Sequence, residues 1–431
     1  GVVESSGLPI ELTPAGASWT REAIFGRSSP IVSRGLVFLT GLDGDALTTV
    51  AYRAATGDEL WRRSVPRLRV DELASETGPA VATPVADDKS VYAFFPEFGL
   101  VAYDREGNER WRLELPPFSS YYGLAASPIL ESGVLVLLCD QSRDPYIVGV
   151  DAASGEELWR RRREVDAESW TTPVVHRPGT GAARVLTFGT FYVDAYDPRT
   201  GEVAWRLPGL GPTPVASPIV DGDRLYVVAP DQQETSEPPT IDYFAGLDTS
   251  GDGALDEAET AGTVWETTMP WLDIDDDGLA SLEEIATQLE IMKSPDYGLV
   301  AIDLAAAGGP EIAWRQRKTL PYIASPIVYR GVMFLVKDGG ILTSYDPASG
   351  EVLKRGRIKG AVEPFFPSPI ATDGKLYLTS SVGTVAVVRA QAQWETLAVS
   401  DLDEQIFASP AVAEGRLFVR TRTKLYAYAG D

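Results

Sequence analysis

Short apolar runs alternate with turn residues along most of the chain. Runs such as residues 36–39, 225–228 and 376–378 have the length of β-strands and are bounded by turn formers such as Gly and Asp. Helical periodicity is almost absent outside residues 240–292. The pattern therefore predicts an all-β protein built from many short strands.

A recurring motif divides these strands into eight units. It reads Ser or Thr, then Pro, then an aliphatic residue, and its prolines are Pro30, Pro84, Pro128, Pro173, Pro218, Pro326, Pro369 and Pro410. Neighbouring prolines are 41 to 54 residues apart, except for an interval of 108 between Pro218 and Pro326. The long interval indicates an insertion into the fifth unit rather than a lost unit.

A second motif, Asp-x-x-Ser/Thr-Gly-x-x-x-Trp, follows most copies of the first and is complete in residues 151–159 and 197–205. Its Asp caps a turn, its Gly accepts a positive φ, and its Trp begins a strand. We expect this large ring to be buried between neighbouring sheets. In the sixth unit Lys354 replaces Trp, and Trp394 is interpreted as the remnant of the seventh copy.

Four short strands in each unit, repeated radially, predict an eight-bladed β-propeller of four-stranded blades. The last unit has three strands, and Ser18-Trp19-Thr20-Arg21 is expected to supply the fourth, which closes the ring without exposed edges. Residues 1–230 are predicted to hold this closing strand and blades one to five in part. Residues 231–297 form a small α-helical insertion in blade five, and residues 298–431 complete blades five to eight. A monomer is expected.

The insertion carries most of the negative charge. Residues 231–296 contain eighteen acidic residues and one basic residue, a net of −17 out of −24 for the whole chain. A surface of this charge repels phosphate backbones, so nucleic acid is not expected as a partner. The concentration of charge points to a local cause within the insertion.

Two stretches of the insertion match the EF-hand calcium loop at each ligand position and at the glycine of the sharp turn. The first is predicted to ligate through Asp248, Ser250, Asp252, the carbonyl of Ala254, Asp256 and Glu259. The second is predicted to ligate through Asp273, Asp275, Asp277, the carbonyl of Leu279, Ser281 and Glu284. An ordinary solvated acidic loop would not explain the glycine and the glutamate at equivalent places in both.

Crowded carboxylates repel one another, and a divalent cation removes that repulsion. Oxygen ligands on a flexible loop favour Ca²⁺ at both sites, with Mg²⁺ or Mn²⁺ as alternatives. Helices are expected to enter at residues 240–246 and to leave at residues 282–292. Because the linker 260–272 is short, a structural role for calcium is favoured over a sensor.

The chain has one cysteine and one histidine, so it can form no intramolecular disulfide. Cys139 lies in an apolar run and is expected to be a buried strand residue rather than a reactive thiol. His176 precedes Arg-Pro-Gly and is expected at a loop or strand end rather than in a catalytic triad. No apolar run of about 18 residues is present, so no transmembrane segment is predicted.

The Asp-x-x-Thr-Gly-x-x-x-Trp motif of residues 197–205 resembles the tryptophan-docking repeat of quinoproteins, which bind pyrroloquinoline quinone. The Ser-Pro-Ile strand starts are more similar to those of the non-catalytic PQQ-like propellers, a group that includes the outer-membrane assembly lipoprotein of Gram-negative bacteria. The resemblance covers nearly all the chain outside the insertion. It implies a binding or scaffold protein that is periplasmic or extracellular.

Quinoprotein dehydrogenases also have eight blades, so an enzyme is the first alternative. The resemblance to them implies a quinone-site Glu-Asn-Asp set and often an adjacent-cysteine disulfide. No such set maps onto this chain, and Cys139 is its only cysteine. Catalytic residues and bound PQQ are therefore not expected. The second alternative is a calcium-dependent adhesion or partner-binding module in which the insertion is the contact.

Segments just before each Ser/Thr-Pro motif should gather at one mouth of the central channel. They are rich in aromatic residues, namely Tyr121, Tyr122, Trp170, Tyr322, Phe365, Phe366 and Phe407, together with Ile406. Two interpretations stay open: the rings pack the blades together, or they form a funnel for a protein, peptide or carbohydrate partner.

Overall fold

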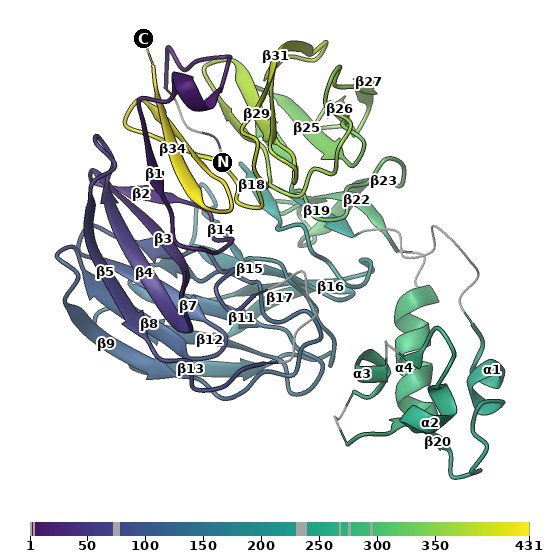
Figure 1. The fold of residues 1–431 in the computed structure, drawn as a ribbon. Helices are drawn as coiled ribbons and strands as arrows, with labels where there is room; N and C mark the ends of the chain where they lie inside the picture. Colours follow the sequence, from purple (N-terminus) through teal and green to yellow (C-terminus); the bar gives the residue numbers. More distant parts are fainter. Residues whose placement is uncertain are drawn as a thin grey trace.

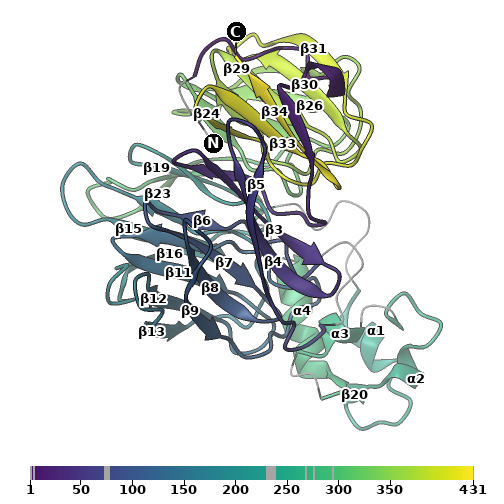
Figure 2. The ribbon, with the colours of Figure 1, turned by 60° about the vertical axis from the view of Figure 1, so that its left-hand side comes forward.

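The computed structural model describes residue 2 and residues 5–71, 78–229, 239–266, 269–274, 277–293 and 296–430. In this part of the chain, eight antiparallel sheets of four strands surround a central axis (Figures 1 and 2). The predicted eight-bladed β-propeller is confirmed. Strands are numbered along the chain, and the first strand of each blade after the Ser/Thr-Pro motif is the innermost.

The blades take their strands in chain order. Blade 1 consists of β2 (Ile31–Ser33), β3 (Leu36–Asp43), β4 (Ala46–Arg53) and β5 (Glu59–Val65), and blade 2 of β6 (Val85–Ala86), β7 (Ser90–Phe95), β8 (Gly99–Asp104) and β9 (Glu109–Glu114). Blade 3 consists of β10 (Ile129–Glu131), β11 (Val134–Cys139), β12 (Tyr146–Asp151) and β13 (Glu157–Arg162), and blade 4 of β14 (Val174–His176), β15 (Arg184–Gly189), β16 (Tyr192–Tyr196) and β17 (Val203–Pro208).

The second half of the ring follows the same plan. Blade 5 consists of β18 (Ile219–Asp221), β19 (Arg224–Ala229), β22 (Gly298–Asp303) and β23 (Glu311–Gln316), and blade 6 of β24 (Ile327–Tyr329), β25 (Val332–Lys337), β26 (Ile341–Tyr345) and β27 (Val352–Arg357). Blade 7 consists of β28 (Ile370–Thr372), β29 (Lys375–Thr379), β30 (Thr384–Arg389) and β31 (Glu395–Asp401), and blade 8 of β32 (Ala411–Ala413), β33 (Arg416–Arg420), β34 (Lys424–Ala429) and β1 (Trp19–Glu22).

The N-terminal strand closes the ring, as predicted. β1 pairs antiparallel with β34, and Trp19 lies opposite Ala427. The chain ahead of β1 contains a short 3₁₀ turn, η1 (Pro14–Gly16), and buries Leu8 and Leu12 against blades 7 and 8. Because the two ends of the chain share one sheet, closure depends on contacts that span almost the whole sequence.

The Ser/Thr-Pro motif links each blade to the next. The backbone N–H of Ser29 donates to the Thr83 hydroxyl at 3.0 Å, and the N–H of Thr83 donates to the Ser127 hydroxyl at 2.9 Å. Ser409 donates back to Ser29 at 3.0 Å, which joins the last blade to the first. The same bond is present at seven of the eight junctions in the described chain. A hydroxyl followed by proline is therefore the connector of the ring.

The tryptophan motif forms a second connector near the outer edge. Trp159 of blade 3 lies 5 % exposed against Gly201 of blade 4, and its indole N–H donates to the Pro198 carbonyl at 3.0 Å. A side chain at Gly201 would place its Cβ 2.4 Å from the indole. Trp19, Trp61, Trp111 and Trp314 meet the glycine of the following blade in the same way. The expected burial of the ring between sheets is confirmed.

The interpretation of Trp394 was wrong. In the motif, Trp159 pairs with Gly149 just beyond a bulge, and the residue in this register position in blade 7 is Ala398, opposite Val387. Trp394 instead precedes β31 and receives the Lys354 ammonium 4.3 Å above its ring. The indole missing from blade 6 is thus replaced by one from the neighbouring blade.

Between β19 and β22 the described residues form four short helices and a two-stranded ribbon. They are α1 (Ile241–Ala245), β20 (Ala254–Leu255), α2 (Glu257–Thr260), α3 (Met269–Leu272), β21 (Ala280–Ser281) and α4 (Leu282–Lys293). Phe244, Leu255, Leu272, Ile285 and Leu289 form an apolar cluster separate from those between the blades. Residues 230–238 and 294–295, at the expected boundaries of the insertion, lie outside the described residues. Figure 1 shows these helices at one side of the ring.

Candidate functional site

Strand direction decides which loops share a face of the ring. The innermost strand of each blade runs away from the segment before the Ser/Thr-Pro motif, and the second strand returns toward it. The turn between the second and third strands therefore lies on the same face as that segment, which we call the mouth face. The helices between β19 and β22 are connected to the ring on this face.

Four of the predicted aromatic residues gather on the mouth face in what we call the tyrosine cluster: Tyr121, Tyr122, Trp170 and Tyr322. The rings of Tyr121 and Tyr122 meet edge to face at 4.8 Å between centroids, and those of Tyr122 and Trp170 at 5.6 Å. Burial and then the neighbouring phenol of Tyr322 raise the pKa of Tyr122. Tyr322 belongs to the segment ahead of blade 6, so its phenol influences Tyr122 from a segment that is far away in the sequence.

Hydrogen bonds fix the base of the tyrosine cluster while its outer rings stay exposed. The indole N–H of Trp170 donates to the Gly123 carbonyl at 3.1 Å. The buried Glu168 carboxylate accepts from the backbone N–H of Tyr121 at 2.8 Å. Tyr122 and Tyr322 remain 39 % and 50 % exposed. A cluster with anchored backbones and open rings presents both apolar area and phenol hydroxyls to solvent.

The remaining predicted mouth residues divide into two groups. Phe366 and Phe407 stack at 6.4 Å between centroids, and the guanidinium of Arg27 lies 4.2 Å above Phe407. Phe365 is 2 % exposed and packs in the core between blades 6 and 7, and Ile406 is fully buried. For Phe365 the structure agrees with the packing interpretation, because that ring fills the gap between two sheets.

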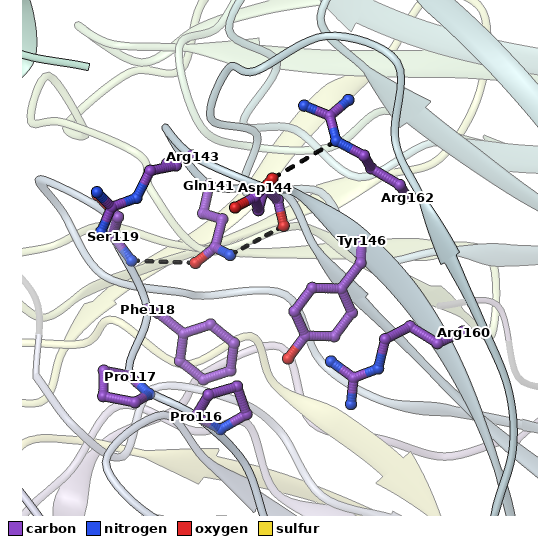
Figure 3. A pocket seen from close by; sticks show the side chains of 10 residues that line it. All are labelled: Pro116, Pro117, Phe118, Ser119, Gln141, Arg143, Asp144, Tyr146, Arg160 and Arg162. Atoms are coloured by element: carbon purple, nitrogen blue, oxygen red, sulfur yellow. Dashed lines mark hydrogen bonds and ion pairs between the residues drawn. The ribbon is translucent and has the colours of Figure 1, made fainter. Parts of the chain in front are cut away.

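A pocket of about 540 Å³ lies farther out on the mouth face, between the segment ahead of blade 3 and β12–β13 (Figure 3). Phe118 and Tyr146 form its floor, stacked at 6.4 Å, and the Arg160 guanidinium lies 4.1 Å above Tyr146. Arg160 pairs with Glu157 at 2.7 Å, and Arg162 pairs with Asp166 at 2.8 Å. Both of these arginines are therefore neutralised within the chain.

The densest group of buried charges is structural. Arg163 is 1 % exposed and contacts Asp140 and Asp194, each at 2.9 Å. Asp140 also accepts from the Ser169 hydroxyl at 2.6 Å, and Asp194 pairs with Arg206 at 2.6 Å. This network ties blade 3 to blade 4, and its polar groups are occupied by one another.

Cys139 and His176 lie where the sequence predicted them. Cys139 ends β11 and is fully buried, and burial raises the pKa of its thiol. His176 ends β14, is 7 % exposed, and its Nε2 lies 2.8 Å from the Asp223 carboxylate. Among the contacts of the described residues, His176 has no serine or cysteine nucleophile beside it, and Cys139 has no histidine beside it.

The first candidate calcium loop folds around its own carboxylates. Asp248 accepts from the backbone N–H groups of Gly251 at 2.6 Å and Gly253 at 2.9 Å. Glu259 accepts from Thr249 and Ser250 across the loop, at 2.8 and 2.9 Å. The N–H groups of glycines 253 and 251 lower the pKa of Asp248, and that of Ser250 lowers the pKa of Glu259. Both carboxylates are therefore held in the ionised form.

The second loop repeats this pattern 25 residues later. Gly278 donates to Asp273 at 2.9 Å, as Gly253 does to Asp248, and Ile274 donates to Glu284 at 2.8 Å. The two loops are joined by the β20–β21 ribbon, in which Leu255 lies opposite Ala280. Equivalent bonds at equivalent positions make the loops a pseudo-symmetric pair.

The metal ligands themselves stay predictions. Asp275 lies outside the described residues. Among the residues that the structure does describe, no three His, Cys, Asp or Glu side chains converge as a metal-binding group. The remaining predicted ligands of the two loops are Ser250, Asp252, Ala254, Asp256, Asp277, Leu279 and Ser281, and all of them are described. No described helix has the length and apolarity needed to cross a membrane.

Comparison with known proteins identifies the repeat. A family model described as outer membrane protein assembly factor BamB matches residues 13–142, 143–237 and 253–429. A protein of that name from Shewanella oneidensis is 21 % identical over 385 residues, which are 84 % of this chain and 85 % of that protein.

The solved structures that share the fold of this chain include a BamB protein and a dehydrogenase. BamB from Moraxella catarrhalis has a TM-score of 0.58 at 13 % identity, and the match covers 96 % of this chain and 98 % of that one. A europium-containing methanol dehydrogenase has a TM-score of 0.59 at 10 % identity, covering 95 % and 86 %. At these identities the likeness shows the fold alone, so it does not separate a binding propeller from an enzyme.

Proposed function

Because the chain belongs to the family of outer membrane protein assembly factor BamB, we propose that it is a non-catalytic propeller that binds a partner protein in the bacterial periplasm or at the outer membrane. The tyrosine cluster on the mouth face is the proposed contact. Calcium held in the two loops between β19 and β22 rigidifies the insertion.

The binding proposal rests on the exposed rings of Tyr122 and Tyr322, which belong to a cluster that hydrogen bonds hold in place. Aromatic rings at the centre of an interface supply much of its binding energy, and tyrosine adds a hydroxyl that tolerates water when the site is free. The cluster joins segments from three different junctions between blades. The whole ring must therefore be folded before the surface exists, as suits a scaffold.

The binding proposal is tested with the double variant Tyr122→Ser and Tyr322→Ser, whose rings are exposed enough to leave the fold intact. Purified protein is used to capture partners from solubilised bacterial envelopes, with quantitative mass spectrometry as the readout. Losing two central aromatic contacts should cost about 2 kcal/mol or more, roughly a thirtyfold loss of affinity for an outer-membrane assembly protein.

Tyr243→Ser is the matched control, because Tyr243 is a 43 % exposed tyrosine on α1 that is not a member of the cluster. It should capture the same proteins as the unaltered chain. Equal capture of assembly proteins by the double variant would overturn the proposed contact. Loss of capture in Tyr243→Ser alone would favour the insertion as the binding surface.

For calcium, the support comes from the repeated geometry of the loops. Asp248 and Glu259, and likewise Asp273 and Glu284, are the first and last ligand positions, and backbone N–H groups already orient all four carboxylates. The bound ion would neutralise carboxylates that otherwise repel one another. The β20–β21 ribbon would transmit that stabilisation from one loop to the other.

Calorimetric titration of chelator-treated protein tests the calcium proposal. The unaltered chain should bind two Ca²⁺ ions, and Asp248→Ala and Asp273→Ala should each lose one. Asp242→Ala, an acidic residue of α1 outside both loops, should still bind two. If the two loop variants bind as the unaltered chain does, the metal assignment is wrong.

The quinone alternative has a direct test. The protein is mixed with pyrroloquinoline quinone and examined for the absorbance of bound quinone and for dye-linked oxidation of alcohols and sugars. We expect neither. Turnover with dye reduction would overturn the non-catalytic proposal.

A further inference from the structure

A second cavity on the mouth face, of about 520 Å³, lies between blades 8 and 1. Its walls come from the segments ahead of β2, β6 and β32, from β3 and from the end of β33. Three of its lining residues are arginines, namely Arg27, Arg420 and Arg422. This gathering stands out in a chain with a net charge of −24.

Among the described residues, no carboxylate contacts the buried Arg420. It is 1 % exposed, and its guanidinium donates to the Ser28 hydroxyl at 2.6 Å and to the carbonyls of Thr40 at 3.0 Å and Ile24 at 2.8 Å. These acceptors are all neutral, and the buried Nε has no hydrogen-bond partner. Burial lowers the pKa of Arg420 to about 10. A buried cation without a counter-ion is costly, so an anion that reaches it is strongly favoured.

Arg163, which is also fully buried, provides a comparison because its role is structural. Arg163 is equally buried, yet its Nε contacts Asp140 at 2.9 Å and its Nη1 contacts Asp194 at 2.9 Å. The chain therefore neutralises a buried arginine when that arginine serves only to join blades. Arg420, which lines a cavity, has no counter-charge among the described residues.

The rim of the cavity combines cations with aromatic rings. The Arg27 guanidinium lies 4.2 Å above Phe407, and that of Arg422 lies 5.3 Å above Phe25. Among the described lining residues, none is acidic. Glu404, in the same loop as Phe407, accepts from the hydroxyls of Thr421 and Thr423 and is not part of the lining.

We propose that this arginine pocket binds an acidic side chain of a peptide segment from a partner protein, with the carboxylate directed at Arg420 and the flanking apolar side chains against Phe25 and Phe407. Charge complementarity selects the carboxylate, and Phe25, 49 % exposed, offers apolar area beside it. The cavity is far larger than a single small anion needs, given about 30 Å³ for one water. The site is separate from the tyrosine cluster and does not depend on the function proposed for it.

The test uses the full chain and two blocked tripeptides, N-acetyl-Leu-Glu-Leu-amide and its Gln counterpart. The ¹⁵N-edited signal of the Arg420 Nε–H is followed during titration, together with the thermal unfolding midpoint. The Glu tripeptide should shift this signal saturably and raise the midpoint, because a ligand bound only to the folded state stabilises it. The Nε–H of Arg163, bonded to Asp140, is the internal control and should not move.

Variants on the rim avoid the risk that replacing buried Arg420 unfolds the protein. Arg422→Gln should weaken binding of the Glu tripeptide about tenfold, as loss of one charge-assisted contact does. Arg53→Gln, which replaces an exposed arginine at the end of β4, should leave the affinity unchanged.

Three results would overturn the proposal. One is the absence of any shift at Arg420 with the Glu tripeptide. Another is an equal response to the Gln tripeptide, which would remove the role of the carboxylate. The last is an equal response to inorganic phosphate alone, which would make the pocket a general anion site and not a peptide site.

Discussion

The contact between Trp159 and Gly201 allows us to predict how much a substitution at the junction of blades 3 and 4 lowers the free energy of unfolding. Gly201 has φ of +67°, a left-handed conformation that costs an alanine about 1–2 kcal/mol. Its substituted Cβ would also lie 2.4 Å from the Trp159 ring, and such overpacking costs about 1–3 kcal/mol more. Gly201→Ala should therefore lower the free energy of unfolding by about 2–5 kcal/mol.

Gly222 supplies the matched control. It has φ of +58°, yet nothing lies within 4 Å of its substituted Cβ. Gly222→Ala should show only the conformational cost, about 1–2 kcal/mol. Urea unfolding followed by far-ultraviolet circular dichroism measures both variants without relying on tryptophan fluorescence.

A double-mutant cycle separates the contact from the backbone strain. In a Trp159→Ala background the crowding is gone, so Gly201→Ala should cost no more than Gly222→Ala does. If Gly201→Ala is no worse than the control in the unaltered chain, or if its excess cost persists without the indole, the assigned role of the tryptophan motif is wrong.

Three further predictions follow from buried or hydrogen-bonded groups. Backbone donors hold the pKa of Asp248 below its usual 3.8, so the hydrogen bonds to this carboxylate stay intact above pH 3.8 and are lost only as the pH falls through the lowered pKa. The amide resonance of Gly253 should therefore titrate with a midpoint below 3.8. A midpoint above 3.8 would contradict the reasoning. Burial raises the pKa of the Cys139 thiol, so a disulfide reagent should fail to modify the folded protein at neutral pH and react after urea is added. Arg163→Met leaves two carboxylates buried without their central cation and should cost about 3–5 kcal/mol, whereas Arg53→Met on the surface should change stability by about 0.5 kcal/mol or less in the same urea assay.

The propeller could be predicted because its two connectors are local and repeated. Seven of the eight described junctions share the hydrogen bond of the Ser/Thr-Pro motif, and five tryptophans place an indole on the glycine of the next blade. Trp394 was misread because the seventh copy lacks the Asp and Gly that mark the motif elsewhere, and the strand register shows that Trp394 lies four residues ahead of Ala398, which holds the tryptophan position. Lys354 stands where the motif has tryptophan and contacts the ring of Trp394 from the next blade. This pairing can be recognised only when the two blades are packed together.

The mouth could be predicted as a region but not residue by residue. Phe365 and Phe366 are neighbours in a segment without regular backbone, so no periodicity indicates which one turns inward. Arg420 ends an ordinary strand, where a charged residue is usually exposed. It is buried because residues from the other end of the chain, including Ser28, fold over it when the ring closes. The arginine pocket therefore has no pattern in the sequence.

Photo-cross-linking from the position of Tyr322 tests the central claim most directly. A photoreactive phenylalanine analogue replaces Tyr322 in one variant and Tyr243, on α1, in another, and both are irradiated in living bacteria. A protein of outer-membrane assembly should be joined to the position of Tyr322 and not to that of Tyr243. Adducts from the Tyr243 position alone, or no adduct at the Tyr322 position, would contradict a binding surface at the mouth of the ring.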